Sequence, residues 1–221
     1  MALLWLIVSI CALVSLTRAQ GNAYYEGPCF QFRGTSYLHF TPDNFNNSND
    51  IHYSFKFKTT SRNGLLMYSK GDYGDDEALY VRDGKLAYHI FNTSPTGIEG
   101  YFGGFFQGNE NVNTDQWIRV NVYRIWRVYN ARLRRWRPQT GFVVQVGNRS
   151  HEHLDYLERA DISLRPVIYF GGYREHLSET VRNFVGEIKD IREQKNGQTF
   201  ETPSLNYKSE VVACSIDIDP V

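Results

Sequence analysis

Residues 51–58 read IHYSFKFK, in which apolar and polar side chains alternate without a break. Successive side chains of a β-strand point to opposite faces, so a period of two places every apolar residue of this stretch on one face. That face carries Ile51, Tyr53, Phe55 and Phe57. The stretch therefore predicts a half-buried strand, with one side against a core and the other in solvent.

Similar strands follow along the chain, separated by turn residues. Arg62-Asn63-Gly64 leads into an apolar run at residues 65–68, and Asp83-Gly84 separates two alternating stretches, as in a hairpin with a tight two-residue turn. No stretch has the period of a helix, so the sequence predicts an all-β fold, a sandwich or jelly roll of two antiparallel sheets. Further strands, each bounded by Gly, Asn or Pro, are expected at residues 118–123, 141–146, 167–170 and 184–191.

Residues 1–19 have the character of a secretory signal peptide. An apolar run at residues 3–13 precedes Thr17 and Ala19, small residues at the positions that a signal peptidase reads. The run is short for a membrane span, which needs about 20 apolar residues. We expect cleavage near Ala19 and a secreted, extracellular protein with no transmembrane segment. The alternative is a buried N-terminal helix or a membrane anchor.

The charges of the chain balance, because 24 Lys and Arg oppose 24 Asp and Glu. A general nucleic-acid binder needs a widespread excess of positive charge to neutralise phosphates, so no nucleic-acid partner is expected. Local charged patches remain compatible with a neutral total.

Three cysteines are present, and one of them lies in the leader. The other two, Cys29 and Cys214, are expected to form a disulfide, because an even pair in an oxidising compartment normally closes. Two free thiols or an intermolecular bridge are the alternatives. Three Asn-x-Ser/Thr sequons, at Asn46, Asn92 and Asn148, predict N-glycosylation in the same compartment.

Several blocks, taken in order, resemble the laminin G-like domain family, and its neurexin members most of all. The resemblance implies a concanavalin-like jelly-roll sandwich at residues 27–214, with a C-terminal tail at 215–221. It also implies a module that binds extracellular or cell-surface proteins or glycans. The blocks are SFKFKTT at 54–60, NGLLMY at 63–68, ALYV at 78–81, DGKL at 83–86, WIRV at 117–120, VQVG at 144–147, IYFGG at 168–172 and NFVGEIKDI at 183–191.

One departure from the family concerns the disulfide. Many members carry a cysteine, paired with a C-terminal cysteine, at the position where this chain has Glu187. Cys214 therefore lacks its usual partner. Since the first and last strands of the family lie close together, the resemblance favours Cys29 as the replacement.

A basic and aromatic run between residues 124 and 137 is expected to form a long hairpin extension with its tip near Asn130-Ala131. Guanidinium groups make two-point contacts with sulfate or carboxylate, and aromatic rings stack on sugar faces. The run therefore predicts a surface for glycans of the heparan sulfate type. The alternative is a solvated hairpin in which arginines cover the tryptophan rings. The residues assigned to glycan binding are Arg127, Arg132, Arg134, Arg135, Arg137 and Trp136.

The resemblance further implies calcium at the rim of the sandwich, where several laminin G-like domains hold it. Matching the motifs places the ligands at the side chain of Asp75, the carbonyl of Asn92 and Asp161. Calcium accepts mixed carboxylate, carbonyl and water oxygens, about six to eight in all. The alternative is a solvated acidic loop, and a glycan on Asn92 would crowd the same rim.

No catalytic pattern is present, so no enzyme activity is expected. Glucan hydrolases on this kind of sandwich place paired carboxylates on one strand face, and the acidic residues near Glu152 and Glu187 form no such array. A nucleophile elbow and a zinc-binding His-Glu-x-x-His are also missing. His151 and His153 could share a strand face and bind a metal, but such surface pairs are more often solvated. The functions in contention are an adhesion or receptor-binding module, a glycan-binding module and a structural component of an extracellular matrix, including a mineralised one.

Overall fold

The structure is a computed structural model. The expected signal peptide at residues 1–19 and the tail at 215–221 lie outside the residues that it describes, and so does Asp161. Within the described ranges no helix is long and apolar enough to cross a membrane. Those ranges are 28–48, 50–72, 74–92, 102–157, 162–175, 181–195, 197–200, 205–206 and 211–214.

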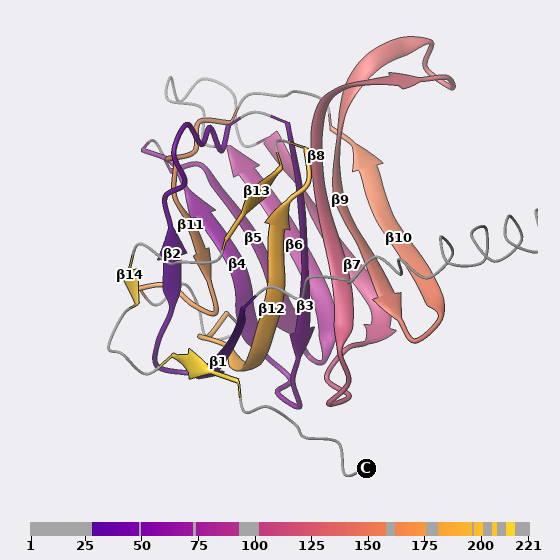
Figure 1. The fold of residues 1–221 in the computed structure, drawn as a ribbon. Coiled ribbons are helices and arrows are strands. Elements are labelled where there is room, and N and C mark those ends of the chain that lie inside the picture. The colour runs from indigo at the N-terminus through magenta and orange to yellow at the C-terminus, as the bar shows by residue number, and fades with distance from the viewer. Residues whose placement is uncertain are drawn as a thin grey trace, which may run out of the picture.

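The described residues form two antiparallel sheets, which Figure 1 shows stacked face to face. Sheet A has the order β10-β9-β8-β3-β12-β1-β15, with β13 paired to β12, and sheet B has the order β14-β2-β11-β4-β5-β6-β7. The predicted all-β sandwich is therefore confirmed. The strands of sheet A are β1 Cys29–Arg33, β3 Ile51–Lys58, β8 Ile118–Asn130, β9 Arg135–Val146, β10 Arg149–Tyr156, β12 Val185–Glu193, β13 Gln198–Thr199 and β15 Val212–Ala213. The strands of sheet B are β2 Leu38–Phe40, β4 Gly64–Lys70, β5 Asp76–Arg82, β6 Lys85–Asn92, β7 Phe102–Asn111, β11 Ile168–Phe170 and β14 Leu205–Asn206.

The core lies between the sheets and is built from their inward-facing side chains. In β3 the four apolar residues that were predicted to share a face are all buried, each at most 1% exposed. Phe55 of this strand meets Phe170 of sheet B edge to face, with ring centroids 5.5 Å apart. Removing one such ring from a packed core costs about 3–5 kcal/mol. Contacts of this kind hold sheet A against sheet B.

The predicted tight hairpin joins β5 to β6 and is confirmed. Asp83 and Gly84 have φ angles of 53° and 79°, as a two-residue turn with positive φ at both positions requires. Pairing continues from the turn to Asp76, which lies opposite Phe91. The hairpin thus brings the start of β5 beside the end of β6, at the rim where the calcium site is predicted.

The two longest strands that the sequence pattern does not predict, β7 and β10, lie at the edges of the sheets. β7 reads FGGFFQGNEN and β10 reads RSHEHLDY, so neither has the apolar alternation of β3. An edge strand has a neighbour on one side only, and its exposed positions need no apolar side chains. Both strands are held by backbone pairing, β7 to β6 and β10 to β9.

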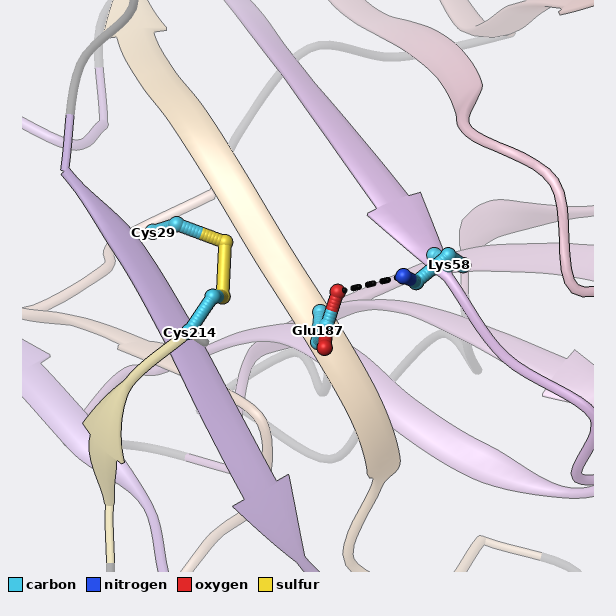
Figure 2. The surroundings of a disulfide bond; sticks show 4 residues. All are labelled: Cys29, Lys58, Glu187 and Cys214. Carbon is cyan, nitrogen blue, oxygen red and sulfur yellow. Dashed lines mark ion pairs between the residues drawn. A yellow bond between two sulfur atoms is a disulfide. The ribbon is translucent and has the colours of Figure 1, made fainter. Parts of the chain in front are cut away.

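A disulfide joins the two ends of the described chain. The Sγ atoms of Cys29 and Cys214 are bonded across a sequence separation of 185, and the amide of Cys214 donates to the carbonyl of Cys29 at 3.1 Å. Figure 2 shows Glu187 beside this bridge, in an ion pair with Lys58 at 2.9 Å. The predicted pairing is confirmed. In a chain-entropy model a loop of this length stabilises the fold by about 4–5 kcal/mol.

Candidate functional site

Residues 125–138, together called the arginine hairpin, project from sheet A. β3 supports β8 only as far as Arg124, which lies opposite Ile51, and β10 supports β9 only from Gln139, which lies opposite Tyr156. Beyond these positions β8 and β9 pair with each other. Figure 1 shows the extension curving away from the sandwich. The predicted extension is present, and the turn at its tip follows Asn130.

The tip of the arginine hairpin combines positive charge with exposed rings. Trp136 is 57% exposed and Tyr129 is 50% exposed. The guanidinium carbon of Arg127 lies 5.0 Å from the Trp136 ring centroid, and Tyr129 meets the same ring edge to face at 5.5 Å. This cation–π packing is what the alternative of a solvated hairpin predicts, in which arginines cover the tryptophan rings. Of the exposed arginines, however, the cluster involves only Arg127. The exposed arginines are Arg127, Arg132, Arg134 and Arg135.

Arg137 differs from the other arginines assigned to glycan binding. Its exposed fraction is 8%, and its Nε donates to the carbonyl of Leu157 at 2.9 Å. It therefore fastens the lower part of the arginine hairpin to the segment that follows β10. We exclude Arg137 from the binding surface, because a polyanion cannot reach a guanidinium buried in this way.

A buried ion pair lies directly below the arginine hairpin. The side chains of Arg124 and Glu77 are both fully buried and form an ion pair between sheet A and sheet B. Arg124 also donates to the carbonyl of Asn47. Tyr88 donates to Glu77 at 2.7 Å, and Tyr53 donates to the Asn47 side chain at 2.6 Å. These contacts satisfy the buried charges, as a stable buried pair requires.

The tyrosines of this network are held in their neutral form. Burial, followed by the negative charge of Glu77, raises the pKa of Tyr53 and Tyr88 well above the ordinary value. Both hydroxyls therefore keep the protons that they donate. Trp126 extends the anchorage to the hairpin itself, since its amide donates to Asp50 at 2.7 Å and its indole donates to the carbonyl of Ser48 at 2.8 Å.

The structure brings part of the predicted calcium site together. Asp75 is 3% exposed, and its carboxylate accepts from the amide of Ser163 at 2.7 Å. Its neighbour Asp76 lies opposite Phe91, so Asp75 is beside the end of β6, where Asn92 is the last residue. The oxygen chemistry of these positions suits a hard cation. Among the described residues, one group brings together the ligand atoms of at least three His, Cys, Asp or Glu side chains. It consists of Cys29, Glu187 and Cys214, so Asp75 is not part of it.

Two of the three sequons lie on the described surface. Asn46 is exposed, and its side chain accepts from the amide of Ser48 at 3.0 Å. Asn148 is exposed in the turn between β9 and β10. For Asn92 the structure describes only the backbone.

His151 and His153 lie on one face of β10 and both contact Glu110 of β7. The distances to the carboxylate are 3.0 Å for His151 and 2.9 Å for His153. Burial by itself would raise the pKa of Glu110, but hydrogen bonds from its own backbone and from His153, together with the charges of both histidines, leave that pKa below its ordinary value. In this arrangement the pair links the edges of the two sheets.

Comparison with known proteins agrees with this architecture. The family model described as Laminin G domain matches residues 57–196. Neurexin-4 of Drosophila melanogaster is 28% identical over 153 residues, which are 69% of this chain and 12% of that protein. The chain thus spans a small part of this relative.

Solved structures show the same fold. Domains LG4-5 of the mouse laminin alpha1 chain superpose with a TM-score of 0.64 and 15% identity, over 86% of this chain and 47% of the other. The LG1-3 region of the laminin alpha2 chain superposes with a TM-score of 0.62 and 20% identity, over 85% of this chain and 34% of the other. With the family model matching more than half of its length, this chain belongs to the laminin G domain family.

Proposed function

We propose that this domain is an extracellular binding module that holds sulfated glycans of the heparan sulfate type on the arginine hairpin. The observation that carries the proposal is the exposure of Arg132, Arg134 and Arg135 at the end of a two-stranded extension. A polyanion can reach these side chains without displacing any part of the sandwich. Laminin G domains bind proteins or glycans, so the proposal assigns this chain one of the ligand classes of its family.

The chemistry of the tip suits sulfate groups. A guanidinium presents a planar fork of donors, and its hydrogen bonds to an anion are strengthened by charge. The Trp136 ring holds the guanidinium of Arg127 in place, so Arg127 adds a fourth cation to the exposed arginines of the hairpin. We further propose that the chain is secreted and that the exposed Asn46 and Asn148 carry N-glycans.

Retention on immobilised heparin tests the arginine hairpin. The variant Arg132→Gln/Arg134→Gln/Arg135→Gln should lose affinity by about threefold to a hundredfold, since each exposed charge contact contributes about 0.2–1 kcal/mol. Binding of the unmodified domain should weaken as salt rises, because exposed charges are screened. The matched control is Arg33→Gln/Arg62→Gln/Arg82→Gln, which removes the same charge elsewhere. Equal retention of the two variants, or no heparin binding at low salt, would contradict the proposal.

We also propose a calcium site at the rim, supported by the burial of Asp75 beside the end of β6. The side chain of Asp75, the carbonyl of Asn92 and Asp161 would hold the ion, and water would complete the shell of about six to eight oxygens. Millimolar calcium should raise the melting temperature relative to chelator, because a ligand of the folded state stabilises it. Asp75→Asn should abolish the shift, and Asp83→Asn, in an exposed turn, should leave it intact. A shift that survives Asp75→Asn would exclude this assignment.

A further inference from the structure

The solvent face of sheet A carries a row of basic residues that the sequence does not reveal. Lys189 of β12 lies opposite Lys56 of β3, Lys56 lies opposite Arg119 of β8, and Arg119 lies opposite Gln145 of β9. We call Lys56, Arg119 and Lys189 the basic row. The chain neighbours Phe57, Ile118 and Ile188 are buried in the core. Because strand side chains alternate, the basic row faces outward.

Like charges in this register have a cost. Neighbouring strands lie about 4.8 Å apart, and like charges directly opposite each other destabilise a sheet. The carboxylate of Asp190 forms an ion pair with Lys56 at 2.9 Å. Across the outward positions of β12, β3 and β8, five cations face two carboxylates. These residues are Lys56, Lys58, Arg119, Lys189 and Arg192, with Glu187 and Asp190. The excess of positive charge favours an anion on this face.

A groove runs beside the basic row, and its volume and lining residues suit a ligand. Its volume is about 290 Å³, and it is lined by the basic row with Trp117, Gln145 and Gly147. The ammonium of Lys189 lies 4.5 Å from the Trp117 ring centroid, and that of Lys58 lies 5.3 Å from it. The first of these cation–π contacts places the ammonium of Lys189 at the wall of the groove. Such a volume is at the low end for ligand pockets, so the groove suits a short segment of a longer molecule.

The same face continues with groups that suit sugars. Tyr123 stacks on His52, with ring centroids 4.3 Å apart, and Asn121 hydrogen-bonds the same imidazole at 3.0 Å. Amides, hydroxyls and aromatic rings thus follow the cations along β3 and β8. The groove lies on the face of the sheet, away from the strand edges that a peptide would extend by backbone pairing.

We infer that this groove is a second saccharide site, which binds a sulfate or carboxylate group of an acidic glycan on Arg119 and Lys189. Gln145 and the edge of Trp117 then contact the sugar ring. The inference takes its ligand class from the proposed function but does not depend on the arginine hairpin. Eight residues of β8 separate Arg119 from Arg127, which is about 26 Å along a strand. A disaccharide is shorter than this separation and therefore cannot occupy both sites.

A heparin-derived hexasaccharide tests the groove in the variant Arg132→Gln/Arg134→Gln/Arg135→Gln. In that background the hexasaccharide should shift the indole resonance of Trp117, and its desulfated counterpart should shift it less. Adding Arg119→Gln/Lys189→Gln should lower the affinity about tenfold, as expected for the loss of two charge-assisted contacts. The matched control Arg62→Gln/Arg82→Gln removes two charges from other elements and should leave the affinity within about twofold. Lys56 is retained in all variants, because its ion pair with Asp190 supports the sheet.

The absence of a Trp117 response in that background would overturn the inference, and so would equal affinities of the groove variant and its control. A polyglutamate peptide that binds more tightly than the hexasaccharide would also overturn it, by assigning the groove to acidic peptides. Failure of the function proposed for the arginine hairpin gives a different result from failure of the groove. In that case the variant Arg132→Gln/Arg134→Gln/Arg135→Gln retains heparin as well as the unmodified domain does. Thermal denaturation of every variant confirms that the fold is retained.

Discussion

Arg124 and Arg132 lie eight residues apart on one hairpin, but Arg124 is fully buried and Arg132 is exposed. Arg124 contacts Glu77 and Asn47 between the two sheets. Arg132 belongs to the turn at the end of the arginine hairpin, beyond the last residues of β8 and β9 that other strands support. The same side chain therefore serves as a structural charge at the base and as a proposed binding group at the tip.

The difference follows from strand alternation and from what lies opposite. Ile118, Val120 and Val122 of β8 are buried, and Arg124 is the next residue with the same orientation. It consequently points at sheet B, where Glu77 supplies the opposite charge. Trp126 still packs against the core. Past it the arginine hairpin leaves the sandwich, and alternation no longer buries every second residue. The arginines of such a run can therefore be sorted into buried and exposed ones only once the last residue that a neighbouring strand supports is known.

The largest effect is expected at the base. Glu77→Ala should lower the free energy of unfolding by about 3–5 kcal/mol, because it leaves the charge of Arg124 buried without its carboxylate. Urea denaturation measures the loss. The double variant Glu77→Leu/Arg124→Met should recover much of it, since apolar residues of similar size often replace a buried pair at little cost.

The tip supplies the comparison for this experiment. Arg132→Met should change the free energy of unfolding by less than about 0.5 kcal/mol, as exposed substitutions usually do. If Glu77→Ala were no more destabilising than Arg132→Met, base and tip would not differ in the way that their burial implies.

The sequence predicts the sandwich most directly through β3, whose apolar residues alternate. Each apolar residue of Ile51, Tyr53, Phe55 and Phe57 faces the core, as the period of two requires. In β5 burial does not alternate, because Leu79 and Val81 belong to the main core and Ala78 and Tyr80 to a second buried cluster. The same reasoning does not predict the edge strands β7 and β10, because exposed positions in both strands and glycines in β7 interrupt the alternation of apolar residues. Their existence depends on backbone pairing with β6 and β9, which no local pattern encodes.

The candidate surfaces divide in the same manner. The arginine hairpin is contiguous in sequence, so its composition alone points to it. The basic row is assembled from residues 56, 119 and 189, and it can be found only when the register of β3, β8 and β12 is known. The ion pair of Arg124 with Glu77 joins positions 47 residues apart on different sheets. The alternation of β8 would have indicated that Arg124 is buried, but not which residue neutralises it.

The smaller effect is expected at Arg135 and Arg137, which are two residues apart on β9. Arg137→Met should lower the free energy of unfolding by about 1–3 kcal/mol, because the buried carbonyl of Leu157 loses its donor. Arg135→Met should change that free energy by less than about 0.5 kcal/mol, because Arg135 is exposed at the tip. Urea denaturation of the two variants, which remove the same charge, measures the difference.

Heparin retention should rank the same two variants in the opposite order. Arg135→Met removes an exposed cation from the arginine hairpin and should weaken binding by about twofold to fivefold, the size of one exposed charge contact. Arg137→Met should leave binding near that of the unmodified domain at temperatures where the fold is intact, because its guanidinium is turned toward Leu157 and away from the ligand. The boundary between base and tip then falls between these two residues. If Arg137→Met weakened heparin binding more than Arg135→Met in a domain shown to be folded, Arg137 would have to be restored to the binding surface and the boundary moved toward Arg124.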